Sequence, residues 1–168
     1  RVRTMAGGSR TSLQAIAADA GVSKALLLYH FSNKTTLLDA LVEWSGQANA
    51  ERMREAARAP HPMPAWRALL GDDEARGECA LLAALAIESG LSTAPRDAVR
   101  AERESAAATL AAAVLREVGL VPRVPGAALG RLLIRQFDGL ACAGAWEDRA
   151  ALDAEIDTFA LAMIGLGR

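Results

Sequence analysis

The sequence is poor in aromatic residues, which make up 4% of its 168 residues as three Phe, three Trp and one Tyr. Proteins that bind single-stranded nucleic acid stack the bases on aromatic side chains, so this composition argues against that class. Alanine is abundant, and runs of β-branched residues are few, which together favour an all-α fold. Apolar residues still reach 52%, so the chain can bury a core and is not a disordered protein.

Cysteine and histidine are also scarce. Cys79 and Cys142 are isolated, without a CxxC pair or a neighbouring histidine. We interpret them as small packing residues of a protein in a reducing cytoplasm, rather than as disulfide or metal ligands, and we expect no cofactor. His30 and His61 are the only histidines, and the sequence has no HExxH motif, no Ser–His–Asp arrangement and no glycine-rich phosphate loop. We therefore do not expect an enzyme.

Long apolar runs are absent as well. The longest, Cys79–Ile87 and Ala106–Leu115, fall far short of the ~20 residues that a membrane-spanning helix needs, so no membrane partner is expected. The net charge is −1, but its distribution is uneven. Residues 1–47 carry five Lys/Arg and three Asp/Glu, or +2, whereas residues 48–168 carry fourteen and seventeen, or −3. The weak basic bias thus lies in the N-terminal part.

Residues 11–41 have the pattern of two short helices joined by a tight turn. Thr11 and Ser12 can cap the first helix, and Gly21 stands where a left-handed residue ends it. Val22 is expected to fill the gap between the helices, and Ser23 to cap a second helix that runs to about His30. This arrangement predicts a helix-turn-helix unit.

The second helix of such a unit enters the major groove, where its N-terminal residues meet the bases. Ser23, Lys24, Ala25 and Leu26 occupy that position in this sequence. Lys24 can reach a guanine edge or a phosphate, while Ala25 and Leu26 can contact thymine methyl groups. The polar side chains Tyr29, His30 and Lys34 follow, and we expect them to contact phosphates. From spacing alone the hairpin could equally be a packing unit.

The run resembles the DNA-binding domain of the tetracycline-repressor (TetR-like) family of bacterial regulators over about a fifth of the chain. The matching elements are Ile16-Ala17, Ala20-Gly21-Val22-Ser23-Lys24, Leu27, Tyr29-His30-Phe31, Lys34 and Leu37-Leu38. The resemblance implies a homodimer with a helical ligand-binding domain, which releases a double-stranded DNA operator when a small-molecule effector binds.

Two features depart from the family. Leu26 stands where a polar or small residue is usual, and Leu28 where a Tyr is very common, so the second helix is unusually apolar. The family also has a full helix before the motif, but Gly7 and Gly8 interrupt this one and no initiator Met is present. We therefore expect the first helix of the DNA-binding domain, assigned to residues 1–47, to be incomplete.

The remaining residues, 48–168, are expected to form a helical ligand-binding and dimerisation domain. A third helix over Thr35–Arg58, capped by Thr35 or Thr36, would join the two domains, and the prolines of residues 59–65 would interrupt the helical structure. Further helices are predicted over Ala65–Leu70, Asp73–Gly90, Pro95–Val118, Gly126–Trp146 and Ala150–Leu166. The second of these should be the buried central helix, and Arg96–Glu104 should be solvated.

Apolar stripes on the last two predicted helices suggest the dimer interface, although they could instead pack on their own domain. The residues assigned to this interface are Leu133, Phe137, Leu140, Gly144, Ile156, Phe159 and Met163. The polar or aromatic residues Trp66, Cys79, Glu88 and Gln136 are candidate ligand contacts in apolar surroundings, where plain packing is the alternative. Such a lining favours a small apolar effector.

The function predicted is that of a ligand-responsive transcriptional regulator, a repressor that binds a palindromic operator as a homodimer. The alternative is a helical protein–protein adaptor that does not bind DNA.

Overall fold

The computed structural model describes residues 12–86, 91–143 and 149–168. In these ranges the chain forms eight α-helices and no β-strand, which confirms the predicted all-α fold. The helices are α1 (Leu13–Asp19), α2 (Lys24–His30), α3 (Lys34–Arg58), α4 (Pro62–Gly71), α5 (Asp73–Ala86), α6 (Thr93–Glu117), α7 (Gly126–Ala143) and α8 (Arg149–Ile164). None of them combines the length and apolar character that are needed to cross a bilayer.

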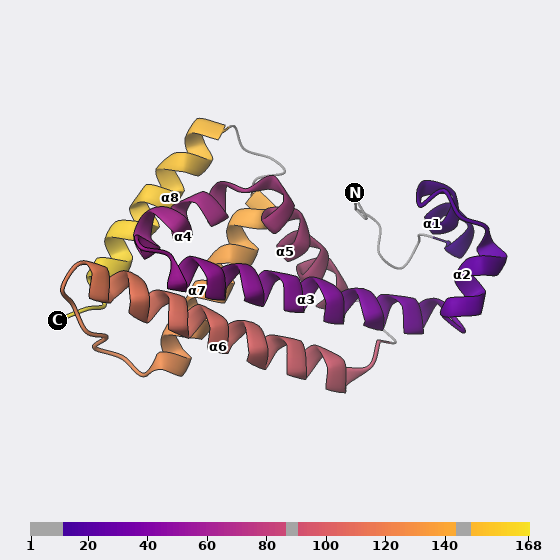
Figure 1. Cartoon of the computed structure of the whole chain (residues 1–168). Helices are drawn as coiled ribbons and strands as arrows, with labels where there is room; N and C mark the ends of the chain where they lie inside the picture. The colour runs from indigo at the N-terminus through magenta and orange to yellow at the C-terminus, as the bar shows by residue number, and fades with distance from the viewer. Residues whose placement is uncertain (1–11, 87–90, 144–148) are drawn as a thin grey trace.

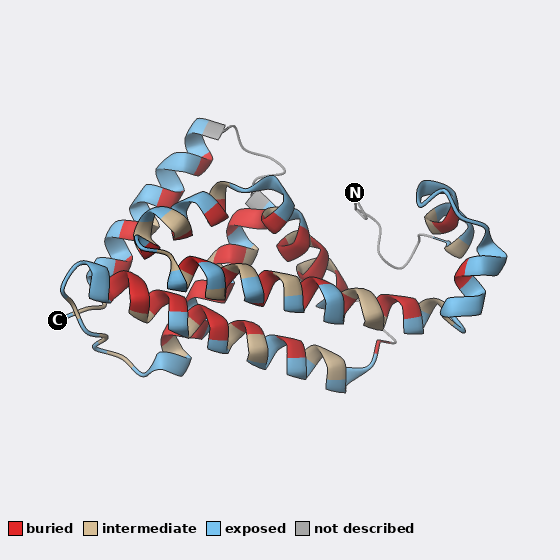
Figure 2. Ribbon diagram, viewed as in Figure 1, coloured by how far each residue is buried: buried red, intermediate tan, exposed pale blue. Residues whose placement is uncertain are grey.

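The two longest helices, α3 and α6, have 25 residues each and run side by side (Figure 1). The short helices α1 and α2 lie at the N-terminal end of α3, apart from the others, and α4, α5 and α6 contact the rest of α3. Helix α6 contacts α3, α4, α7 and α8, and its surface towards α3 is buried (Figure 2). The central helix is therefore α6, which corrects the assignment of that place to the helix around Cys79.

The turns after α1 and α6 each have a glycine in the left-handed region, with φ of 68° at Gly21, as predicted, and 76° at Gly119. In both turns the N–H of the glycine donates to the carbonyl of the residue three positions before it. The N–H of the next residue donates to the carbonyl of the residue five positions before it. This pairing satisfies the free carbonyls at each helix end. Ser12 and Ser23 are the N-caps of α1 and α2, as predicted.

Two predicted helix starts are wrong. Helix α3 is capped by Asn33, whose Oδ1 accepts from the N–H of Thr36 at 2.9 Å, and not by Thr35 or Thr36. Helix α4 begins at Pro62 and includes Pro64, although the prolines were expected to keep this segment non-helical. The first backbone N–H groups of a helix have no intrahelical acceptor, so proline there costs no hydrogen bond.

The buried apolar residues form three clusters. The largest lies among α3 to α8, and a small one joins α1, α2 and the start of α3 through Ala17, Leu27 and Leu37. The third joins Leu38 and Val42 of α3 to side chains of α5 and α6. Leu38 and Val42 thus belong to the packing of the helical domain, because α3 turns that face towards α5 and α6.

Two glycines allow helices to approach closely. A Cβ atom at Gly46 would overlap the side chain of Val99 on α6, and one at Gly130 would overlap the backbone carbonyl oxygen of Glu104. A side chain can rotate away from such an overlap, whereas a helical backbone cannot. The contact at Gly130 therefore fixes the distance between α7 and α6.

We expect Gly130→Ala to destabilise the fold by about 1–3 kcal/mol, because the new methyl group forces α7 away from α6. Gly77→Ala is the matched control, since a Cβ there meets no atom within 4 Å. The control should instead stabilise the protein by up to about 1 kcal/mol through helix propensity. Urea unfolding monitored by circular dichroism measures both, and equal effects of the two substitutions would contradict the close approach.

Candidate nucleic-acid interface

The helix α2 is held against α1 and α3 by one side only. Leu27 is its buried residue and packs with Ala17 of α1 and Leu37 of α3. Ser23 precedes the helix, and its Oγ accepts a hydrogen bond from the N–H of Leu26 at 3.0 Å. The serine therefore fixes where α2 begins, and Leu27 fixes which of its faces points outwards.

The outward face of α2 is exposed to solvent, and much of its surface is apolar. Lys24 and Ala25 are exposed, and Leu26 and Leu28 are 46% and 39% exposed. Tyr29 is 83% exposed, and its ring lies edge-on to that of His30 with 5.2 Å between the ring centroids. Exposed apolar groups gathered on one short helix mark a surface that a partner covers.

Lys34 is the first residue of α3, and a short turn separates it from His30, the last residue of α2. The preceding N-cap residue Asn33 also donates from its Nδ2 to the Oγ of Ser32, and Ser32 Oγ lies 3.3 Å from Thr36 Oγ1.

Thr11 lies outside the described residues. Val22, expected to fill the gap between the helices, is instead 38% exposed because its backbone closes the turn while its side chain points outwards.

The start of α3 is also tied to the rest of the molecule. The carboxylate of Asp39 accepts hydrogen bonds from the backbone N–H of Ser92 at 3.2 Å and from its Oγ at 2.7 Å. Ser92 is the N-cap residue of α6, so a side chain of α3 satisfies the first turn of α6. A movement of α6 would therefore be transmitted through the contact between Ser92 and Asp39 to the N-terminal end of α3, next to α1 and α2.

A buried polar centre lies where α3, α5, α6 and α7 meet. Arg103 of α6 is only 5% exposed, and its Nη2 donates to Asp138 of α7 at 2.6 Å while its Nε donates to Oδ1 of Asn49 at 2.9 Å. Burial by itself lowers the pKa of Arg103, but its bonds to Asp138 outweigh this and raise the pKa. Cys79 of α5 accepts from Asn49 at 3.2 Å, and burial raises the pKa of its thiol to about 11.

Sequence reasoning missed this centre because it assigned Arg96–Glu104 to solvent. A signal was nevertheless present, since Arg103 is in helical phase with the apolar residues Val99, Ala106 and Leu110, all of them buried. A charged residue inside an apolar stripe indicates a buried ion pair when an opposite charge lies on a neighbouring helix.

The candidate ligand contacts do not surround one cavity. Trp66 is buried in the largest cluster with its ring edge-on to Phe159, Cys79 belongs to the buried polar centre, and Gln136 is half-buried on α7. Glu88 lies outside the described residues. Trp66 and Cys79 are packing residues, which was the alternative stated for them, so this group gives no support to a small apolar effector.

The residues assigned to the dimer interface require a correction. Phe159 packs against the chain's own core, and five others are buried in that core at 1–3% exposure: Leu133, Phe137, Leu140, Ile156 and Met163. Gly144 lies outside the described residues. The stripes face inwards because α7 and α8 cover the core of their own chain. A partner can therefore contact only the opposite faces of these two helices.

The geometry is that of a helix-turn-helix protein whose second helix presents an exposed face, followed by a helical domain. Residues 5–41 match the family model described as bacterial regulatory proteins, tetR family. The N-terminal unit is thus similar to the DNA-binding domain of TetR family regulators, which confirms the resemblance seen in the sequence. No curated protein sequence matches this chain.

Two solved structures have similar folds. One is the crystal structure of a TetR family transcriptional regulator, PfmR from Thermus thermophilus, with 20% identity, a TM-score of 0.65 and coverage of 94% of this chain and 90% of that chain. The other is the crystal structure of Mycobacterium smegmatis AmtR, with 26% identity, a TM-score of 0.60 and coverage of 95% of this chain and 78% of that chain. The likeness extends through the helical domain.

We expect Asp138→Ala to destabilise the protein by about 3 kcal/mol, because it leaves the buried guanidinium of Arg103 without its carboxylate. Asp97→Ala is the control, since it breaks an ion pair with Arg100 in which both side chains are about two-thirds exposed. That loss should cost less than about 1 kcal/mol. Chemical denaturation measures the free energy of unfolding of both variants. Similar losses would show that the buried Arg103–Asp138 pair contributes no more to stability than an exposed pair.

Proposed function

We propose that this protein is a ligand-responsive repressor that binds a palindromic operator as a homodimer. The observation that carries the proposal is the exposed face of α2, anchored by Leu27 from behind and preceded by the Ser23 cap. A short helix held in this way can enter a major groove with its N-terminal turn against the bases. The protein then acts by occupying DNA, and no catalytic step is assigned to it.

The contacts divide between bases and backbone. Lys24, Ala25 and Leu26, in the first turn of α2, read base edges and thymine methyl groups, with Ser23 beside them. Tyr29, His30 and Lys34 hold phosphates, since Tyr29 and His30 end α2 where it leaves the groove and Lys34 follows it at the start of α3. Ser12, the N-cap of α1, and Thr11, which precedes it in the sequence, are assigned to the DNA backbone. With so few polar side chains, part of the sequence preference comes from DNA shape.

Dimerisation places two such helices about one turn of DNA apart, ~34–36 Å. The surfaces proposed for it are the outer faces of α7 and α8, opposite to the buried stripes. Leu132 and Leu161 are 41% and 72% exposed there. Small or short side chains surround them, among them the exposed residues Gly139, Ala154 and Thr158, and these let helices approach closely. The two helices of each protomer would form a four-helix bundle.

Release of DNA requires that an effector favours a different spacing of the two α2 helices. Helix α3 is the lever, because its first turns belong to the DNA-binding core and its next turns to the packing with α5 and α6. We place the boundary between the two domains near Leu41, which contacts both clusters, rather than at residue 47. A coupling of about 1–3 kcal/mol changes DNA affinity by about 5–150-fold.

We expect Lys34→Ala to weaken binding to all duplexes alike and to reduce the salt slope by about one contact per protomer, because it removes a phosphate contact. Lys24→Ala should instead flatten the preference at one symmetric pair of base positions, by about 1–3 kcal/mol. Fluorescence anisotropy on duplexes enriched from a random-sequence pool, at several salt concentrations, measures both.

Arg123→Ala is the control for charge, since Arg123 is an exposed residue of the loop between α6 and α7. It should leave both the slope and the base preference unchanged. Retention on DNA that does not depend on salt, or that Arg123→Ala reduces as much as Lys34→Ala, would overturn the proposal and favour the adaptor.

We expect Leu161→Glu to give a monomer, because it places a charge in the apolar centre of the proposed interface. Val121→Glu is the control, since Val121 is 52% exposed but lies outside α7 and α8. Sedimentation velocity reports the oligomeric state. Alkylation of Cys142, the exposed cysteine on α7, should also become faster in the Leu161→Glu variant. A Leu161→Glu variant that still sediments as a dimer would place the interface elsewhere.

A further inference from the structure

A cleft of about 700 Å³ opens among α3, α5, α6 and α7, beside the buried polar centre. Apolar side chains contribute to its lining from each of the four helices: Val42, Leu82, Val99 and Ile134. All four are buried at 4–7% exposure, so they line the deep part of the cleft. This part can bury the apolar body of a small molecule.

The remaining lining is dominated by arginine. Arg96 and Arg100 of α6, Arg131 and Arg135 of α7 and the buried Arg103 line the cleft, against the three carboxylates of Asp97, Glu104 and Asp138. The local charge is therefore five minus three, or +2, in a chain whose net charge is −1. Two of the three carboxylates are already paired, Asp138 with Arg103 and Asp97 with Arg100.

The two arginines of α7 differ from Arg100 of α6, which already pairs with Asp97. Arg131 and Arg135 are four residues apart on α7. Like charges at this spacing repel and weaken a helix. Arg131 and Arg135 are exposed, and neither forms an ion pair or hydrogen bond with any residue in the described part of the chain. Guanidinium groups in this state are available to a carboxylate or phosphate, which they bind in a bidentate manner.

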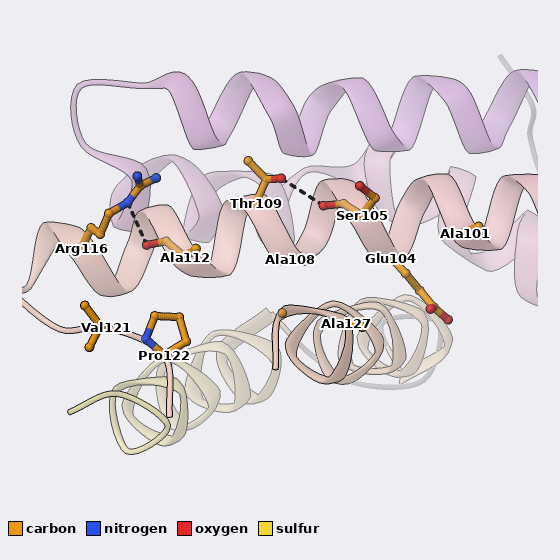
Figure 3. A pocket seen from close by; sticks show the side chains of 11 residues that line it. Ala101, Glu104, Ser105, Ala108, Thr109, Ala112, Arg116, Val121, Pro122 and Ala127 are labelled. Carbon is orange, nitrogen blue, oxygen red and sulfur yellow. Dashed lines mark hydrogen bonds between the residues drawn. The ribbon is translucent and has the colours of Figure 1, made fainter. Parts of the chain in front are cut away.

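The other large groove of the helical domain differs in these respects. It runs along α6 towards the loop before α7, and its lining is mainly small residues (Figure 3). Arg116 is its only arginine, and its Nε donates to the carbonyl of Ala112 in its own helix. Thr109 likewise donates to the carbonyl of Ser105. Arginine is therefore concentrated in the cleft beside the polar centre and not in this groove.

We propose that the cleft between α5, α6 and α7 binds an organic anion with an apolar body, whose acidic group is held by Arg131, Arg135 and the arginines of α6. The proposal rests on the proposed function, because it names the chemical class of the effector. It replaces the small apolar effector expected from the sequence. Val42 lines the cleft one turn after Leu38 and Asp39, so an occupant touches α3 directly beside its junction with the DNA-binding core.

A pair of fluorescent probes tests the proposal. The probe 8-anilinonaphthalene-1-sulfonate carries an anionic group on an apolar body, and N-phenyl-1-naphthylamine has the same ring skeleton without the charge. We expect the anionic probe to bind the full chain and to be displaced by octanoate but not by 1-octanol. Arg131→Gln/Arg135→Gln should weaken its binding at least tenfold and leave the neutral probe within about twofold.

The matched control is Arg116→Gln/Arg123→Gln, which removes the same charge outside the cleft and should change the anionic probe less than twofold. The second variant, Arg96→Gln/Arg100→Gln, alters the opposite wall and should also weaken the anionic probe tenfold. Equal losses in the control and cleft variants, or equal displacement by octanoate and octanol, would overturn the proposal. Arginine-dependent binding of the anionic probe by a protein that fails to retain DNA would support this cleft while refuting the repressor function.

Discussion

One buried cation holds together the helices on which the rest of the molecule depends. The guanidinium of Arg103 bonds Asn49 on α3, Cys79 on α5 and Asp138 on α7, so four helices meet at one side chain. A charge in this position is expensive to bury, and only complete pairing makes it tolerable. The centre therefore constrains how these helices can move, because a displacement of any one of them breaks a bond to a charged group.

This constraint gives α3 its mechanical role. From Asn49 onwards α3 is part of a rigid arrangement, whereas its first turn belongs to the small core of α1 and α2. Between the two lie Leu38, Asp39 and Val42, which contact α5, α6 or the residue that begins α6. In the proposed release of DNA, a rearrangement at this short stretch would change the direction of α1 and α2 while the polar centre stays intact. The arginine cleft opens beside the same stretch.

Local signals in the sequence predicted local structure well. Ser12, Ser23 and Gly21 have one physical role each, in capping or in a left-handed turn, and the structure shows them in those roles. The start of α3 was predicted to within one residue, although its N-cap is Asn33 and not Thr35 or Thr36. The helix-turn-helix unit followed from the same signals, which depend on neighbours in sequence rather than on the fold.

Signals that depend on distant partners were harder to interpret. The stripes on α7 and α8 showed that one side of each helix is covered, but periodicity cannot say whether the cover is the same chain or another. Arg103 was assigned to solvent because its partners come from three other helices. The arginine cleft was missed for a related reason, since the two walls lie on α6 and α7 and meet only after folding.

The small size of the core that supports α2 has a consequence for the energetics of recognition. Among the described residues of that core, only Ala17, Leu27 and Leu37 are buried, whereas the main cluster holds many large side chains. So little buried area supports only a low free energy of local opening, and backbone amides in α1 and α2 will exchange with solvent sooner than those of α6. In the proposed complex with DNA, part of the binding free energy would offset the ordering of this unit, which lowers affinity for every sequence and leaves discrimination between sequences intact.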